Sequence, residues 1–180
     1  DTAAGGRSGA AGSVMEWIDK AGYACAVGWA GAYCVTAYVG NVRHRRPIPP
    51  DSLIEVQARI IHTGRTSMHV VVTVSSAEVS TRSYTPATTC VLIFVAKDQD
   101  GRPTGVPAWA PVTRSDRKLA AAALERMAAR AEIKRLMLDE VYTDASRAPR
   151  TTLRFLVPTA VVNFGGNAHG GTVMRWIDEA

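Results

Sequence analysis

The two ends of this chain of 180 residues repeat each other. Residues 12–21, GSVMEWIDKA, align with residues 171–180, GTVMRWIDEA, and seven of the ten positions are identical. A match of this length that contains Met, Trp and Asp is not expected by chance, and an offset of 159 residues is the size of a domain, not of a solenoid repeat. The repeat predicts two similar modules. We expect this chain to hold the first module without its first strand (1–112), a linker with a helix (113–150) and the start of the second module (151–180).

The first module reads as one helix followed by strands. Apolar residues recur at helical spacing from Val14 to about Trp29, and Ser13 is the expected N-cap. Four later segments have the alternating or continuous apolar pattern of strands: 32–39, 52–62, 66–76 and 87–97. The last is nearly all apolar, so we expect it to be central. This order predicts an α+β fold in which an antiparallel sheet buries the helix.

The composition changes after residue 113. Ser115 or Asp116 is the expected cap of a connecting helix that runs to about Leu138 and is rich in Ala, Leu, Arg and Glu. Residues 151–157 then read as a strand, followed by a glycine-rich loop and the beginning of another helix.

Composition and charge exclude several classes of protein. An apolar fraction of 47% excludes disorder as the dominant state, and no apolar run reaches the length of a membrane span. The formal charge of +5 suggests an anionic partner, but aromatic residues make up only 7% and the basic residues are dispersed, so we expect no nucleic-acid partner. Three cysteines without metal-ligand spacing, Cys25, Cys34 and Cys90, indicate buried thiols in a reducing compartment, so we expect a cytoplasmic protein.

Three motifs carry a resemblance to a known family. Residues 163–171, NFGGNAHGG, lead into the apolar-Trp-apolar-Asp helix of the second repeat, residues 62–68 read HTGRTSM, and residues 46–48 read RPI. In order and spacing these motifs resemble the acyl-CoA hydrolase family of hotdog thioesterases, and the tandem repeat resembles its double-hotdog branch. The resemblance covers nearly the whole chain except the linker.

The resemblance implies a fold and an activity. The fold is the hotdog fold, an antiparallel sheet wrapped around a central helix, with two modules paired so that active sites form between them. The activity is hydrolysis of fatty acyl-CoA to free fatty acid and CoA, with no metal and no cofactor, since coenzyme A is part of the substrate. Hotdog modules also imply a homo-oligomer, whether a dimer, a trimer or a hexamer.

The expected catalytic residues come from both repeats. Asp19 and Asp178 each follow the glycine of their repeat by seven residues, which places each carboxylate two helical turns beyond it on the same side. A carboxylate in an apolar helix is costly unless it is paired, functional or exposed. Glycines such as Gly171 bring backbone N–H groups to the positive end of the helix dipole, where an oxyanion is stabilised. The resemblance implies that Asn163 of one module and Asp19 of the other form one site. In that site Asp19 is the general base or nucleophile.

The opposite pairing lacks its amide. In the alignment of the two copies, Asn163 corresponds to Ala4 and His169 to Ala10. We therefore expect an active site at Asp19 and an impaired one at Asp178. His169 has a second interpretation, in which it only hydrogen-bonds its own loop.

The turn at Gly64, Arg65, Thr66 and Ser67 is the expected contact for the CoA moiety. The alternative is a turn whose hydroxyl groups satisfy its own backbone. Arg43, Arg45 and Arg46 are further candidates for the nucleotide phosphates. A non-catalytic acyl-CoA binder remains the alternative function, but such a protein has no need for the pair of Asp19 and Asn163.

Overall fold

The computed structural model describes residues 8–40, 42–141, 151–154, 156–162 and 166–179. The elements follow one another along the chain as α1 (Ser8–Ala30), β1 (Tyr33–Val39), β2 (Arg43–His44), β3 (Leu53–Thr63), β4 (Ser67–Ala77), β5 (Thr85–Lys97), α2 (Arg114–Asp139), the 3-10 helix η1 (Thr159–Val161) and α3 (Gly170–Glu179). Among the described residues, no helix is both long and apolar enough to cross a membrane.

The strands form one antiparallel sheet in the order β1-β5-β4-β3, and the short strand β2 also pairs with β5. The four longer strands coincide with the predicted ones to within two residues, and the apolar strand β5 is central as expected. Its register aligns Thr36 of β1 with Phe94 and Phe94 with Met68 of β4. These pairs fix which side chains of neighbouring strands face the same side of the sheet.

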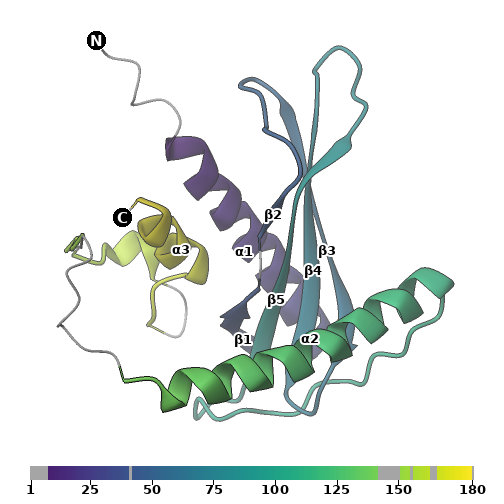
Figure 1. The fold of residues 1–180 in the computed structure, drawn as a ribbon, viewed down its shortest axis with the longest axis vertical. Helices are drawn as coiled ribbons and strands as arrows, with labels where there is room; N and C mark the ends of the chain where they lie inside the picture. The colour runs from purple at the N-terminus through teal and green to yellow at the C-terminus, as the bar shows by residue number, and fades with distance from the viewer. Residues whose placement is uncertain (1–7, 41, 142–150, 155, 163–165, 180) are drawn as a thin grey trace.

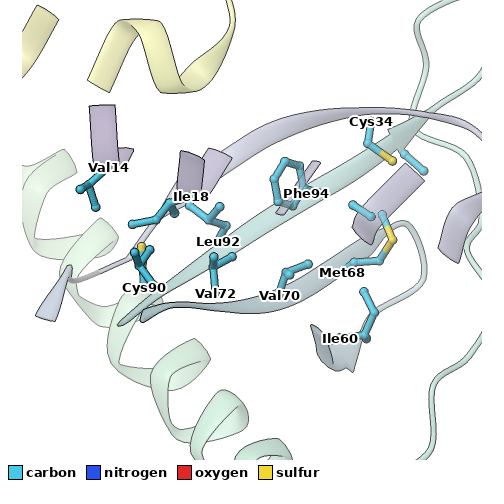
Figure 2. Packing of buried hydrophobic residues seen from close by; sticks show 13 residues of the cluster. Val14, Ile18, Cys34, Ile60, Met68, Val70, Val72, Cys90, Leu92 and Phe94 are labelled. Carbon is cyan, nitrogen blue, oxygen red and sulfur yellow. The ribbon is translucent and has the colours of Figure 1, made fainter. Parts of the chain in front are cut away.

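The main core lies between α1 and one face of the sheet. Alternate residues of β4 and β5, among them Val70, Val72, Leu92 and Phe94, are fully buried against Ile18 of α1 (Figure 2). The alternation places these side chains on one face because successive residues of a strand point to opposite sides. The predicted fold, an antiparallel sheet around a helix, is confirmed.

Helix α2 crosses the other face of the sheet (Figure 1). Its Ala123 is fully buried and packs with Ile61 and Val71, which lie on the side of the sheet opposite α1. The helix begins two or three residues earlier than predicted, because Thr113 and Asp116 form a reciprocal capping box. Thr113 N–H donates to Asp116 Oδ2 at 2.8 Å, and Asp116 N–H donates to Thr113 Oγ1 at 3.1 Å. Thr113 is therefore the cap, not Ser115 or Asp116.

Two further predictions are wrong. Ser13 is not an N-cap, because α1 begins at Ser8 and includes it. Ala10 and Ala11 are strong helix formers, which is consistent with the earlier start. The described residues of 151–157 form no strand. A strand needs a neighbour for its hydrogen bonds, and no described strand pairs with this segment.

Helix α3 packs on α1 on the side away from the sheet core (Figure 1). The predicted helix of the second repeat is thus present as α3, and the two copies of the repeated sequence lie against each other. Part of the predicted glycine-rich loop, residues 163–165, lies outside the described residues. The division into modules stays a prediction, and so does the tandem arrangement.

Candidate functional site

Asp19 lies at the meeting point of α1, α3 and β1. Its side chain is buried, with only 4% of its surface exposed. Thr36 Oγ1 of β1 donates a hydrogen bond of 2.9 Å to Asp19 Oδ1. A buried carboxylate is costly without such partners. The apolar periodicity of α1 turns this position inward, so its burial follows from the same pattern that builds the core.

The first turn of α3 lies directly on this carboxylate. A Cβ atom at Gly170 would stand 2.9 Å from Asp19 Oδ1 and 3.1 Å from Thr36 Oγ1. A Cβ atom at Gly171 would stand 2.9 Å from Asp19 Cβ and 2.8 Å from Glu16 Cα. No side chain fits at either position without movement, so the two glycines allow the close approach of the helices.

The N–H groups of these two glycines lie at the start of α3, where Gly170 lines the groove beside Asp19 and Gly171 is buried against α1. The first amides of α3 that bond back to the helix start are those of Thr172 and Val173, both donating to the carbonyl oxygen of His169. Within the described part of the chain, no acceptor is found for the amides of Gly170 and Gly171. A helix leaves its first N–H groups unpaired and positive, which is the arrangement that stabilises an oxyanion.

A groove of about 490 Å³ opens beside these residues. Asp19, Thr36, Asn167, His169 and Gly170 supply its polar groups. Its other lining residues are largely apolar: Tyr23, Cys34, Val35, Ala37, Tyr38, Val39, Ala168, Val173, Met174 and Ile177. Such a groove can hold an apolar chain against one buried carboxylate.

Of the other predicted catalytic residues, the structure places Gly171 beside Asp19 and Asp178 away from it. Asn163 lies outside the described residues. Gly171 adjoins Asp19, as expected. Asp178 is exposed near the end of α3 and does not line the groove. The pairing of Asp19 with Asn163 therefore stays a prediction. His169 lines the groove, and its backbone N–H donates to the Val161 carbonyl at 2.9 Å.

The turn predicted to contact CoA connects β3 to β4 and lies outside the groove. Gly64 N–H donates to the Ser67 carbonyl at 2.9 Å, which confirms the tight turn. The carbonyls of Arg65 and Thr66 accept from Val106 and Ala96. The backbone of this turn is thus held in place, and its contact with CoA stays a prediction.

A second cavity, of about 350 Å³, lies between α2 and the sheet. Four arginines line it, Arg43, Arg45, Arg126 and Arg130, and none of their side chains has an ion-pair partner among the described residues. Arg46 instead donates to the carbonyls of Ser76 and Thr85. His69 is buried at this cavity. Burial, followed by the charges of His62, Arg130 and Arg126, lowers the pKa of His69 to about 4.

The three cysteines are free thiols; the predicted burial holds for Cys34 and Cys90, whereas Cys25 is only partly buried. Cys34 and Cys90 are buried, and burial raises the pKa of each to about 11. Because the thiolate is the nucleophilic form, these thiols are unreactive at neutral pH.

Sequence reasoning missed Thr36. It stands in the strand YCVTAYV, where one polar residue interrupts an apolar pattern, and that interruption was the available signal. Its role depends on a contact with a residue 17 positions away, which only the packing of β1 beside α1 creates.

The sequence of this chain is similar to those of thioesterases. Residues 11–82 match the thioesterase superfamily. Protein VdlD of Helicobacter pylori is 31% identical over 115 residues, which are 64% of this chain and 66% of VdlD. An uncharacterized acyl-CoA thioester hydrolase of Bacillus subtilis, YkhA, is 30% identical over 124 residues, which are 69% of this chain and 72% of that protein.

Solved structures share the fold. An acyl-CoA hydrolase from Staphylococcus aureus, in complex with butyryl coenzyme A and coenzyme A, has a TM-score of 0.64 and 29% identity, over 71% of this chain and 80% of that chain. A hexameric acyl-CoA thioesterase has a TM-score of 0.65 and 32% identity, over 68% of this chain and 79% of that chain.

Proposed function

We propose that this chain, which belongs to the thioesterase superfamily, hydrolyses fatty acyl-CoA to the free fatty acid and CoA. One observation carries the proposal: the buried carboxylate of Asp19 faces the glycine N-terminus of α3 inside a largely apolar groove. Hydrolysis of a thioester needs an activated water, hydrogen-bond donors for the oxyanion and an apolar site that shields the acyl chain from solvent. The groove offers a group for each need.

The proposed reaction uses these groups in order. The Asp19 carboxylate takes a proton from a water molecule while the water oxygen attacks the thioester carbonyl carbon. The N–H groups of Gly170 and Gly171 stabilise the negative charge that develops on the carbonyl oxygen. The carbon–sulfur bond then breaks, the CoA thiolate leaves and is protonated, and the carboxylic acid is released. Thr36 holds the Asp19 carboxylate in place through its hydrogen bond. No cofactor is required beyond the CoA of the substrate.

Solved variants of the Staphylococcus aureus acyl-CoA hydrolase support these assignments. Its solved variants include single replacements of an asparagine, an aspartate and a threonine by alanine. The aspartate and the threonine of those variants are 17 positions apart, as are Asp19 and Thr36. The asparagine precedes the aspartate by 15 positions, as Asn163 precedes Asp178. We infer that Asp19 and Thr36 have the roles of that aspartate and threonine.

Only one of the two related sites is proposed to be active. Asn163 is assigned to the Asp19 site, where it would orient the water or donate to the carbonyl. The site of Asp178 is proposed to be impaired because Ala4 stands where an asparagine is needed.

Two finer proposals concern the substrate and the assembly. The turn at Gly64, Arg65, Thr66 and Ser67 is proposed to contact the CoA moiety where a neighbouring module brings it to the groove. A homo-oligomer is proposed because related thioesterases include a hexameric one and because the outer edges of β1 and β3 are unpaired among the described strands.

The test is thiol release from a panel of short to long acyl-CoA substrates. Asp19→Asn keeps the shape of the side chain but removes the base, so we expect turnover to fall by at least about 100-fold. Asp178→Asn is the matched control in the other repeat, and we expect turnover close to that of the native chain.

The outcomes separate the alternatives. Turnover that survives Asp19→Asn and disappears in Asp178→Asn would reverse the assignment of the two sites. A native chain that binds acyl-CoA without releasing thiol would be a binder or sensor, not an enzyme.

A further inference from the structure

The α1–α3 contact is reciprocal. Gly12 and Gly171 are equivalent in the repeat, and so are Glu16 and Arg175. Gly171 lies on Glu16, whose Cα would be 2.8 Å from a Cβ atom at Gly171. Gly12 is buried under Arg175 in the same way, and a Cβ atom at Gly12 would overlap with Arg175 Cγ. Each glycine therefore meets the residue four positions further along in the other copy, which is the pattern of a local two-fold axis.

The charged positions of the repeat are reversed between the copies. Only three of the ten positions differ, and one of them is the exchange of Ser13 for Thr172. The other two exchange a charge for its opposite: Glu16 aligns with Arg175, and Lys20 aligns with Glu179. The remaining seven positions, which include both glycines and both aspartates, are identical. Side-chain charge is thus the property in which the two helices differ most.

The reversal places opposite charges at the axis. Arg175 Nη1 lies 3.2 Å from Glu16 Oε1, and the two side chains are 41% and 22% exposed. Glu179 Oε1 lies 3.4 Å from Arg175 Nε on the same helix and forms an ion pair with it, and Arg175 Nε has no hydrogen-bond partner among the described residues. Residues near a two-fold axis meet their own equivalents. Two α1 helices paired in this way would set Glu16 against Glu16, and two α3 helices would set Arg175 against Arg175.

We propose that Glu16 and Arg175 are specificity-determining residues that select an α3 segment, and not a second α1, as the partner of α1. Like charges at such a contact repel, and opposite charges attract, so the same backbone geometry favours one pairing over the other two. The selected pairing is the one that places Gly170 and Gly171 on Asp19. The inference concerns helix pairing and does not depend on hydrolysis.

Charge reversals in the full chain test the selection directly. Arg175→Glu reproduces the Glu–Glu contact of an α1–α1 pair, and Glu16→Arg reproduces the Arg–Arg contact of an α3–α3 pair. For a chain of this length we expect each single reversal to lower the thermal unfolding midpoint by about 2–4 °C. The double reversal, Glu16→Arg with Arg175→Glu, restores opposite charges and should recover at least half of the loss. Hydrogen exchange of the α3 amides should rise in the single variants and fall again in the double variant.

The matched control is Arg135→Glu in α2, which reverses one member of the exposed pair between Arg135 and Glu132. Single reversals at the α1–α3 contact that lower the midpoint no more than this control would overturn the proposal. A double reversal whose loss equals the sum of the two single losses would overturn it as well.

Discussion

The burial of His69 makes the stability of the folded chain depend on pH. It projects from β4 toward α2, is 4% exposed, and has the ring of His62 at 5.2 Å in an edge arrangement. The groups that face it, His62 on β3 and Arg126 and Arg130 on α2, add positive charge when protonated. Burial and these charges oppose its protonation, so the pKa of His69 is lowered from 6.5 to about 4.

This pKa predicts how stability depends on pH. Between pH 6.5 and pH 4 the unfolded chain binds a proton at His69 that the folded chain does not, so stability falls as the solution is acidified. The full effect is about 3 kcal/mol of unfolding free energy, from about 1.4 kcal/mol for each pH unit. Urea unfolding at several pH values measures it. His69→Gln should show a smaller loss across this range, and curves that run parallel for the two chains would contradict the prediction.

Single residues also mark how far the sequence alone can lead. Asp19 was predicted because the helix that carries it resembles the motif of the acyl-CoA hydrolases; its place in an apolar helix alone left an exposed position equally open. Thr36 was not, because its hydrogen bond to Asp19 crosses from a strand to a helix. The cap of α2 was predicted at Ser115 or Asp116, two or three residues after the observed cap at Thr113. Ser, Thr and Asp all cap well, and only the reciprocal bonds with Asp116 distinguish among them.

Elements were predictable where a pattern repeats along them. The alternation of Met68, Val70, Val72 and Val74 defines β4 because these four residues fill the core under α1. The two-residue strand β2 has no pattern, since two exposed residues paired with β5 carry no periodicity. Residues 151–157 have the pattern of a strand but no described partner. A strand pattern indicates that one face of the segment is apolar, but a strand forms only where a sheet edge supplies hydrogen-bond partners.

Two glycines of α1 give opposite predictions at the scale of the helix. A Cβ atom at Gly28 would meet no atom within 4 Å, whereas one at Gly22 would lie 2.7 Å from Leu92 Cδ1 and 3.0 Å from Phe94 Cε2. Gly28→Ala should raise the free energy of unfolding by about 0.5–1 kcal/mol through reduced chain entropy. Gly22→Ala should lower it by about 1–3 kcal/mol through overpacking. Chemical denaturation of both variants measures the two changes in unfolding free energy. Changes of the same sign would refute the packing of α1 described above.

At the scale of the whole molecule, the outer edges of β1 and β3 have no partner strand among the described residues. Strand β3 pairs with β4, and among the described residues no strand pairs with its outer edge. Half of the amides in an antiparallel edge strand point away from the sheet. An unpaired edge of this kind can accept a further strand.

Hydrogen exchange tests whether this edge is open in solution. The alternate amides of β3 that point away from β4 should exchange at least about tenfold faster than the amides of the central strand β5, because local opening is easier where no partner holds the backbone. Mass spectrometry or NMR can follow both strands in one experiment. Slow exchange along the whole of β3 would mean that another strand covers it, from a second copy or from a part of the chain that the structure does not describe.

The contact between α1 and α3 has a consequence for how such a molecule changes over generations. When two identical chains meet across a two-fold axis, every mutation appears on both sides at once, and a change that helps one side must be tolerated by the other. Here the two sides of the contact are encoded at separate places in one reading frame. Glu16 and Arg175 can therefore mutate independently. A substitution on one side of the contact can be favourable without being tolerated at the equivalent position on the other side.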